Sequence, residues 1–348
     1  MRKLALVMGA GAIALIGVSV ASAQDRLPRE CRQEIRQLCG GNRAQLRDCL
    51  RENASELSEK CRGELRERMQ QRQVGDRIGN RASAQDRDVS GAQEVAYGSA
   101  ALQKTDFWRG SGDKAPLVLF VHGGGWKRGD KQMMATSAML PHWQAAGYAV
   151  ASANYRLVPD ATVEQQAADV AAAFAHFRTN AKALGIDPER IVLVGHSAGA
   201  HLVALVGTDP QYLAVHDLKL SHIAGVLPND GAAYDVPSQM GENAMLLGDT
   251  YQQAFGTDPE RQKALSPTRH AAAPNAPNFL LIHVQRQDGV RQAKGLEAAL
   301  QAAGTNVERR EFEGEGLRGH MEINRKLGDP DYPATAVVDS WLKRVFAR

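Results

Sequence analysis

Residues 195–199 read Gly-His-Ser-Ala-Gly and contain Ser197, the chain's best candidate for a reactive side chain. An apolar run, Ile-Val-Leu-Val at 191–194, directly precedes them. A buried strand that ends in a Gly-x-Ser-x-Gly turn and enters a helix holds a serine hydroxyl above the edge of a sheet, because the two glycines permit a sharp turn. The pattern therefore predicts that Ser197 is a nucleophile that forms a covalent intermediate.

A serine hydroxyl is a weak nucleophile at neutral pH and needs a general base. After a turn of this kind the acid and the base follow the serine, in the order acid and then histidine. His320 fits this order because it follows the last predicted strand, in a glycine-rich loop at 316–320 that can return an imidazole to Ser197. The other histidines after Ser197 lie inside predicted elements or precede the expected acid: His201, His216, His222, His270 and His283.

Two carboxylates follow predicted strands and could orient His320. Asp288 comes just after the strand Phe279–Val284, and Asp230 comes after Ile223–Leu227. The role is to accept the second imidazole N–H, which fixes the tautomer and stabilises the imidazolium. The sequence favours Asp288 and leaves Asp230 as the alternative, while a solvated loop carboxylate is the plain interpretation of either residue.

The sequence His-Gly-Gly-Gly-Trp at 122–126 follows the predicted strand Leu117–Val121. Three glycines after a strand let backbone N–H groups point into a pocket, as in the glycine loops that bind an oxyanion. The predicted donors are Gly124, Gly125 and Ala198, and Trp126 and His196 are predicted to contact substrate. A phosphate loop is excluded because no Lys-Ser/Thr pair follows.

Strands alternate with helices from residue 95 onward, which predicts a mostly parallel sheet with helices on both faces, an α/β fold. In such sheets the chemistry gathers at the carboxyl ends of the strands. The further expected strands are 149–153, 191–194 and 307–312, and the expected helices are 131–146, 163–184, 198–206, 290–303 and 334–346.

The first 23 residues have a basic start, an apolar middle and an Ala-Ser-Ala exit, which predicts a cleaved signal peptide and a periplasmic or secreted protein. No later segment is long and apolar enough to span a bilayer. The formal net charge of +3 and the ordinary composition do not suggest binding to nucleic acid.

All four cysteines lie between the signal peptide and residue 62. An even, clustered set in an exported chain predicts two disulfides. Zinc is the competing interpretation, but the segment has no histidine and no close Cys-x-x-Cys pair. We expect a helical cysteine-rich module at 24–73, a polar linker at 74–92 and a catalytic domain at 93–348. The module is either a structural appendage or an element that docks a partner in the cell envelope.

With these pieces placed, residues 95–346 resemble an α/β-hydrolase, and more narrowly the bacterial esterase/lipase group related to hormone-sensitive lipase and arylformamidase. The stretches that carry this resemblance are Tyr97-Gly98 with Asp106, residues 122–126, residues 154–157, Asp187-Pro188-x-Arg190 and residues 195–202. Many relatives have an acid loop that reads His-Gly-x-x-Asp. Here residues 283–288 read His-Val-Gln-Arg-Gln-Asp, one residue longer.

The spacing of Cys31, Cys39, Cys49 and Cys61, with Leu-Ser before the last, resembles a cysteine-rich repeat of the Golgi glycoprotein family. The resemblance implies nested bridges, Cys31–Cys61 and Cys39–Cys49.

The sequence as a whole predicts an exported serine hydrolase that cleaves small-molecule carboxylic esters and needs no metal or cofactor. An arylformamidase-type amide hydrolase is the nearest alternative, and a binding protein that kept the fold without turnover is the second. The long stretch 229–275 is expected either to cap the site or to pack as ordinary helices.

Overall fold

The computed structural model describes residues 29–39, 56–63, 91–241 and 248–347. They belong to two compact units, residues 1–88 and residues 89–348. The predicted signal peptide and most of the predicted linker lie outside the described residues. None of the helices in the described ranges is long and apolar enough to cross a membrane.

The N-terminal unit is built around helix α1 (Arg29–Cys39) and a disulfide between Cys31 and Cys61, whose Cα atoms are 5.3 Å apart. Ile35 and Leu57 complete its small buried core. The pairing Cys31–Cys61 is therefore confirmed. Cys39 is also disulfide-bonded, and Cys49, its expected partner, lies outside the described residues. The apolar core within residues 29–39 and 56–63 is small, and the covalent link adds stability to it.

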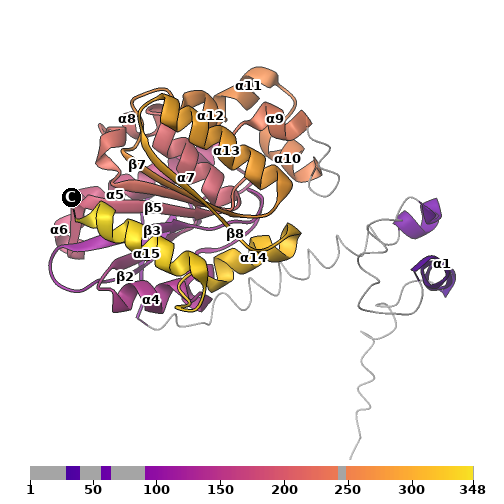
Figure 1. The fold of residues 1–348 in the computed structure, drawn as a ribbon, viewed down its shortest axis with the longest axis horizontal. Helices are drawn as coiled ribbons and strands as arrows, with labels where there is room; N and C mark the ends of the chain where they lie inside the picture. Colours follow the sequence, from indigo (N-terminus) through magenta and orange to yellow (C-terminus); the bar gives the residue numbers. More distant parts are fainter. Residues whose placement is uncertain (1–28, 40–55, 64–90, 242–247, 348) are drawn as a thin grey trace, which may run out of the picture. The chain divides into compact units, whose positions relative to one another are not determined.

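The second unit is organised on an eight-stranded sheet of order β1-β2-β4-β3-β5-β6-β7-β8 (Figure 1). β1 pairs antiparallel with β2 and β2 with β4, whereas all pairs from β4 to β8 are parallel. This α/β-hydrolase-type sheet agrees with the predicted fold class. The strands are β1 (Gln93–Ala96), β2 (Lys104–Trp108), β3 (Ala115–Val121), β4 (Ala149–Ala153), β5 (Ile186–His196), β6 (Gly225–Asn229), β7 (Asn278–Val284) and β8 (Asn306–Phe312).

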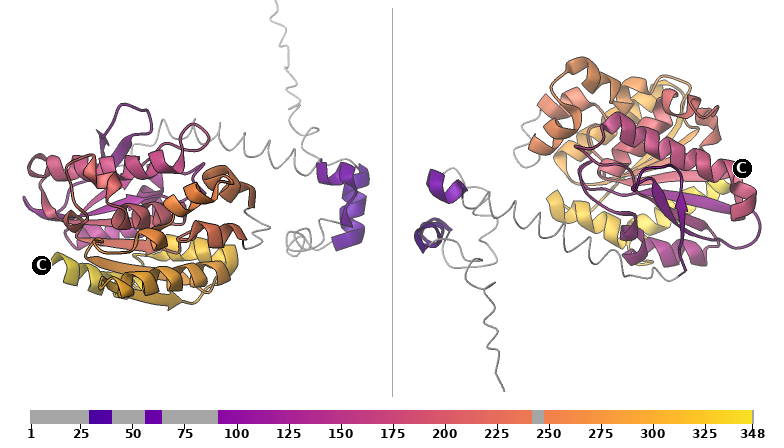
Figure 2. Two further views of the ribbon diagram at one scale, coloured as in Figure 1. Left: turned by 90° about the horizontal axis from the view of Figure 1, so that it is seen from above. Right: turned by 180° about the vertical axis from the view of Figure 1, so that it is seen from behind.

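Helices cover both faces of the sheet (Figure 2). On β3, Leu117 and Leu119 pack in one apolar core with α5, α7 and α13, and Val118 and Phe120 pack in a second core with α4, α14 and α15. The alternation of side chains along a strand produces these two cores. The helices are α4 (Met139–Ala145), α5 (Val163–Thr179), α6 (Ala181–Leu184), α7 (Ala198–Thr208), α8 (Gln211–Ala214), α9 (Val236–Gly241), α10 (Gly248–Phe255), α11 (Pro259–Ala264), α12 (Pro267–His270), α13 (Gln287–Ala302), α14 (Gly316–Lys326) and α15 (Pro333–Phe346), with 3-10 turns η3 (Lys131–Thr136) and η4 (Leu220–His222).

Three predicted elements differ from the structure. The expected helix 131–146 is the 3-10 turn η3 followed by α4, because Ser137 between them is extended. The expected helix 163–184 is interrupted at Asn180, which ends α5. His320 was expected in a loop and lies on α14 instead.

Candidate active site

Ser197 occupies the turn between β5 and α7 in a left-handed backbone conformation, with φ 56° and ψ −118°. This conformation is strained for a non-glycine residue, and such strain persists only where the surroundings hold it. A Cβ on Gly199 would lie 2.1 Å from the carbonyl oxygen of Val121, and one on Gly195 would lie 2.2 Å from that of Gly199. Both flanking positions therefore require glycine. Ser197 stays partly exposed while its neighbours on both sides are buried.

The imidazole of His320 faces the carboxylate of Asp230. Nδ1 of His320 lies 2.5 Å from Oδ2 of Asp230, and the backbone N–H of Val284 donates to Oδ1 at 3.1 Å. Because an ionised carboxylate only accepts hydrogen bonds, Nδ1 carries the proton and Nε2 is left as the acceptor. The pair has the chemistry of a general base with its orienting acid.

Asp230 is fully buried and directly follows β6. Burial by itself raises the pKa of Asp230. The hydrogen bond from His320 and the charge of Arg286 outweigh that effect and lower the pKa to about 2. The carboxylate is therefore ionised at every pH at which the protein is expected to work.

The structure corrects the assignment of Asp288 as the acid. Asp288 lies in the first turn of α13, where its Oδ2 pairs with Nη1 of Arg286 at 2.5 Å. The carboxylate of Asp288 therefore contacts Arg286, and no contact between it and His320 is found among the described residues. The alternative that the sequence left open, Asp230, is the partner of His320.

His196 lies behind His320 and is buried, with 2% of its surface exposed. Its Nε2 lies 2.9 Å from the carbonyl oxygen of His320, and the two ring centroids are 4.5 Å apart. Since a carbonyl only accepts, Nε2 of His196 is the donor. Burial, with a contribution from His320, lowers the pKa of His196 to about 3, so the ring is neutral. His196 was predicted to contact substrate, and the structure instead makes it a link between β5 and α14.

The glycine loop after β3 packs against the serine turn. A Cβ on Gly123 would lie 2.9 Å from Cβ of Ser197. Gly124 and Gly125 have positive φ values of 131° and 61°, which glycine adopts without strain. Within the described ranges, the N–H groups of Gly124, Gly125 and Ala198 donate to no protein acceptor. The role of these three N–H groups as oxyanion donors stays a prediction.

Trp126 is enclosed by protein and only 4% exposed, although it was predicted to contact substrate. Its indole Nε1 donates to Nδ1 of His201 at 3.3 Å, and Nε2 of His201 in turn donates to the carbonyl of Leu265 at 2.8 Å. The ring also contacts Tyr251 and Phe255 of α10, with centroids 5.7 and 4.8 Å away. Trp126 therefore fastens the glycine loop to the stretch considered as a cap. Met245 to Leu247 of that stretch lie outside the described residues.

Comparison of the sequence with known proteins identifies the family of the chain. The sequence profile of the BD-FAE family matches residues 108–300, more than half of the chain. The chain belongs to the BD-FAE family. The matched residues include Ser197, Asp230 and Asp288 and end before His320. The likeness of residues 31–61 to the cysteine-rich Golgi repeat lies outside the BD-FAE match and stays a prediction.

Relatives of this BD-FAE chain include two Mycobacterium tuberculosis proteins named as esterases. The chain is 31% identical to esterase LipC over 223 residues, which are 60% of this chain and 55% of LipC. It is 28% identical to esterase LipQ over 225 residues, 61% of this chain and 53% of LipQ. The chain thus spans about half the length of the curated relatives it matches.

Solved structures with the same fold include esterase B from Lactobacillus rhamnosis, with a TM-score of 0.62 and 21% identity over 80% of this chain and 93% of that one. Esterase 2 from Thermogutta terrifontis has a TM-score of 0.60 and 22% identity over 74% of this chain and 94% of that one. At these identities the likeness establishes the α/β-hydrolase fold.

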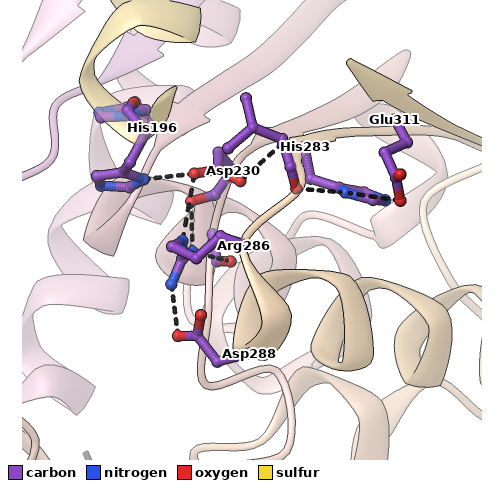
Figure 3. A network of polar contacts seen from close by, with 9 residues as sticks. His196, Asp230, His283, Arg286, Asp288 and Glu311 are labelled. Atoms are coloured by element: carbon purple, nitrogen blue, oxygen red, sulfur yellow. Dashed lines mark hydrogen bonds and ion pairs between the residues drawn. The ribbon is translucent and has the colours of Figure 1, made fainter. Parts of the chain in front are cut away.

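Sequence reasoning missed Arg286 as part of the site. Its guanidinium lies between Asp230 and Asp288 (Figure 3). The available signal was a basic residue inside the acid loop, two positions before Asp288.

Proposed function

We propose that this protein is a serine hydrolase that cleaves carboxylic esters through an acyl-enzyme. The observation that carries the proposal is the buried His320–Asp230 pair, 2.5 Å between Nδ1 and Oδ2, in the same unit as the strained serine turn at Ser197. The relatives named as esterases support an ester as the substrate.

In the proposed first half-reaction, the hydroxyl oxygen of Ser197 attacks the ester carbonyl while Nε2 of His320 takes the hydroxyl proton. The tetrahedral intermediate collapses when His320 returns this proton to the leaving alcohol. A water molecule, deprotonated by the same imidazole, then attacks the acyl-enzyme, and the second tetrahedral intermediate collapses to the free acid as His320 returns the proton to the leaving Oγ of Ser197. Asp230 stabilises the imidazolium in both halves without itself taking the proton.

The N–H groups of Gly124, Gly125 and Ala198 are proposed to bind the oxyanion of both tetrahedral intermediates. Each such donor contributes about 3 kcal/mol when it meets the negative charge only in the transition state. Their fixed geometry fits this role, because positive φ values at Gly124 and Gly125 turn the loop away from the sheet ladder.

We also propose that the protein is exported. The signal-like residues 1–23 predict this, and the Cys31–Cys61 bridge supports it because disulfides persist in oxidising compartments. In that setting the cysteine-rich unit is a candidate docking element for an envelope partner.

The test is active-site labelling with a fluorophosphonate together with hydrolysis of p-nitrophenyl acetate. We expect Ser197→Ala to abolish labelling and to lower kcat by at least about a thousandfold. Ser340→Ala is the matched control, since Ser340 lies on the exposed side of α15 and donates only to the carbonyl of Ala336. Full activity and labelling in Ser197→Ala would contradict the proposal, and an unlabelled wild type would identify a binding protein instead.

Amide hydrolysis is the second candidate, favoured by a 30% identity to arylacetamide deacetylase of Bos taurus over 48% of this chain and 44% of that protein. The same residues serve both reactions. A substrate panel that pairs each aryl ester with the matching arylformamide or arylacetamide separates the two by the ratio of their kcat/KM values.

A further inference from the structure

Arg286 is the buried cation of the site. It lies between the end of β7 and the start of α13, with 15% of its side chain exposed. Its Nη2 donates to two backbone carbonyls, that of Gly231 at 3.0 Å and that of Asp230 at 3.3 Å. Its Nη1 pairs with Asp288, and its Nε lies 3.5 Å from Oδ2 of Asp230 (Figure 3). One planar group thus contacts the acid's backbone, the acid's carboxylate and a second anion.

The turn at Asp230 and Gly231, whose carbonyl groups accept hydrogen bonds from Arg286, is strained. Asp230 has a φ of 46°, in the left-handed region that a non-glycine residue adopts at a cost of about 1–2 kcal/mol. The next residue is tightly enclosed, since a Cβ on Gly231 would lie 2.3 Å from the hydroxyl of Tyr234 and 2.8 Å from Cβ of Ala200. Such a conformation persists when several contacts hold it together. The two carbonyl bonds from Arg286 are contacts of this kind.

The contacts of Arg286 leave the carboxylate free for His320. Its Nε is buried and makes no hydrogen bond within the described residues, although it lies 3.5 Å from Oδ2 of Asp230. The shorter contact to Oδ2 is the one from His320, at 2.5 Å. Arg286 therefore contributes positive charge near Oδ2, while its hydrogen bonds go to the main chain and to Asp288.

We propose that Arg286 is the positioning residue for the acid Asp230, and that Asp288 holds Arg286 in place. The guanidinium fastens the left-handed turn through two carbonyls, so that Oδ2 points at His320. The carboxylate of Asp288 accepts a hydrogen bond from Nη1 of Arg286 and so fixes the plane of the guanidinium. Asp288 contacts Arg286, whereas Asp230 contacts His320, so the carboxylate of Asp288 has a supporting role. The inference rests on the proposed hydrolase function and extends it.

The first experiment replaces Arg286 in the full chain and measures kcat and KM separately on p-nitrophenyl acetate. We expect Arg286→Met to lower kcat by about 10- to 100-fold with KM changed less than about threefold, because a misplaced acid impairs the chemical step. Arg286→Lys keeps the charge but lacks the planar fork, so we expect it to recover less than about a third of the lost kcat. Recovery of wild-type kcat by lysine would overturn the positioning role in favour of charge alone.

A spectroscopic readout separates positioning from a general loss of stability. We expect the proton between Nδ1 of His320 and Oδ2 of Asp230, 2.5 Å apart, to give a far-downfield ¹H resonance in wild type, which its loss in Asp230→Asn would assign. We expect this resonance to be shifted or broadened in folded Arg286→Met. A folded variant that keeps an unchanged resonance and wild-type kcat contradicts the proposal.

Arg309→Met is the matched control. Arg309 has 21% of its side chain exposed and pairs with Glu297 and with Nε2 of His283, so its removal also breaks an ion pair beside β7 without touching Asp230. We expect its kcat and its downfield resonance to match wild type. An equal loss of kcat in Arg309→Met and Arg286→Met would show that the effect is general and would overturn the proposal.

Asp288→Asn tests the supporting role and remains informative if the Arg286 variants do not fold. We expect a kcat about two- to fivefold below wild type, and no further loss when Asp288→Asn is added to Arg286→Met, because the two residues act through one contact. Additive losses would contradict the coupling between Asp288 and Arg286.

The Ser197→Ala variant separates the two proposals. Should it retain activity, the proposed hydrolase function itself fails. Should Ser197→Ala be inactive while Arg286→Met behaves as wild type, only the present inference fails.

Discussion

Replacing Asp230 with asparagine tests the assignment of the acid most directly. Asp230 accepts two hydrogen bonds, from the Val284 N–H at Oδ1 and from Nδ1 of His320 at Oδ2. Asparagine has one acceptor oxygen, so it can serve only one of them. If the oxygen stays on Val284, the amide NH₂ faces His320 and forces the proton onto Nε2, which can then accept nothing from Ser197. If it turns to His320, a buried N–H loses its acceptor, which costs about 1–3 kcal/mol.

In both orientations the imidazolium also loses its counter-charge. We therefore expect Asp230→Asn to lower kcat by about 10⁴-fold, as for a triad aspartate, which corresponds to about 5 kcal/mol. Asp288→Asn, which removes the same charge from the other carboxylate that contacts Arg286, should lower kcat no more than about fivefold. The assay is kcat and KM on p-nitrophenyl acetate, with circular dichroism to confirm folding. A thousandfold loss in Asp288→Asn together with a loss under tenfold in Asp230→Asn would refute the reasoning.

Three further outcomes follow from burial and close packing. Gly199→Ala should unfold the protein or greatly lower its urea midpoint, because the new Cβ would lie 2.1 Å from the carbonyl oxygen of Val121 in β3. The control Gly295→Ala, at a position on α13 with no neighbouring atom within 4 Å, should raise the free energy of unfolding by about 0.5–1 kcal/mol. Burial lowers the folded-state pKa of His196 to about 3 and that of His201 to about 4, so below pH 6.5 the unfolded chain binds more protons than the folded one. The free energy of unfolding, measured from pH 6.5 to pH 4.5, should therefore fall with acidification by about 1.4 kcal/mol per pH unit for each of the two rings. Trp126→Phe leaves Nδ1 of His201 without its donor and should destabilise the fold by about 1–3 kcal/mol in thermal or urea unfolding.

The parts of the site that the sequence predicts are those set by neighbours along the chain. The serine turn, the glycine loop and the apolar strand before each lie within a few residues, and their steric demands are met locally. The parallel strands 115–121 and 278–284 are likewise visible as short apolar runs. The antiparallel strands β1 and β2 are not, because β2 is defined by its pairing with β4, more than forty residues later in the chain.

By itself, then, the sequence predicted Ser197 and the glycine loop from local backbone geometry, and His320 from the order in which an acid and a histidine follow the serine. Only the tertiary structure decided which carboxylate reaches His320. Asp230 is 90 residues from His320 in the chain. The choice between Asp230 and Asp288 depends on where the ends of the neighbouring strands β6 and β7 lie relative to α14. Asp288 lies in the first turn of α13 and pairs with Arg286, a contact that residue order does not reveal.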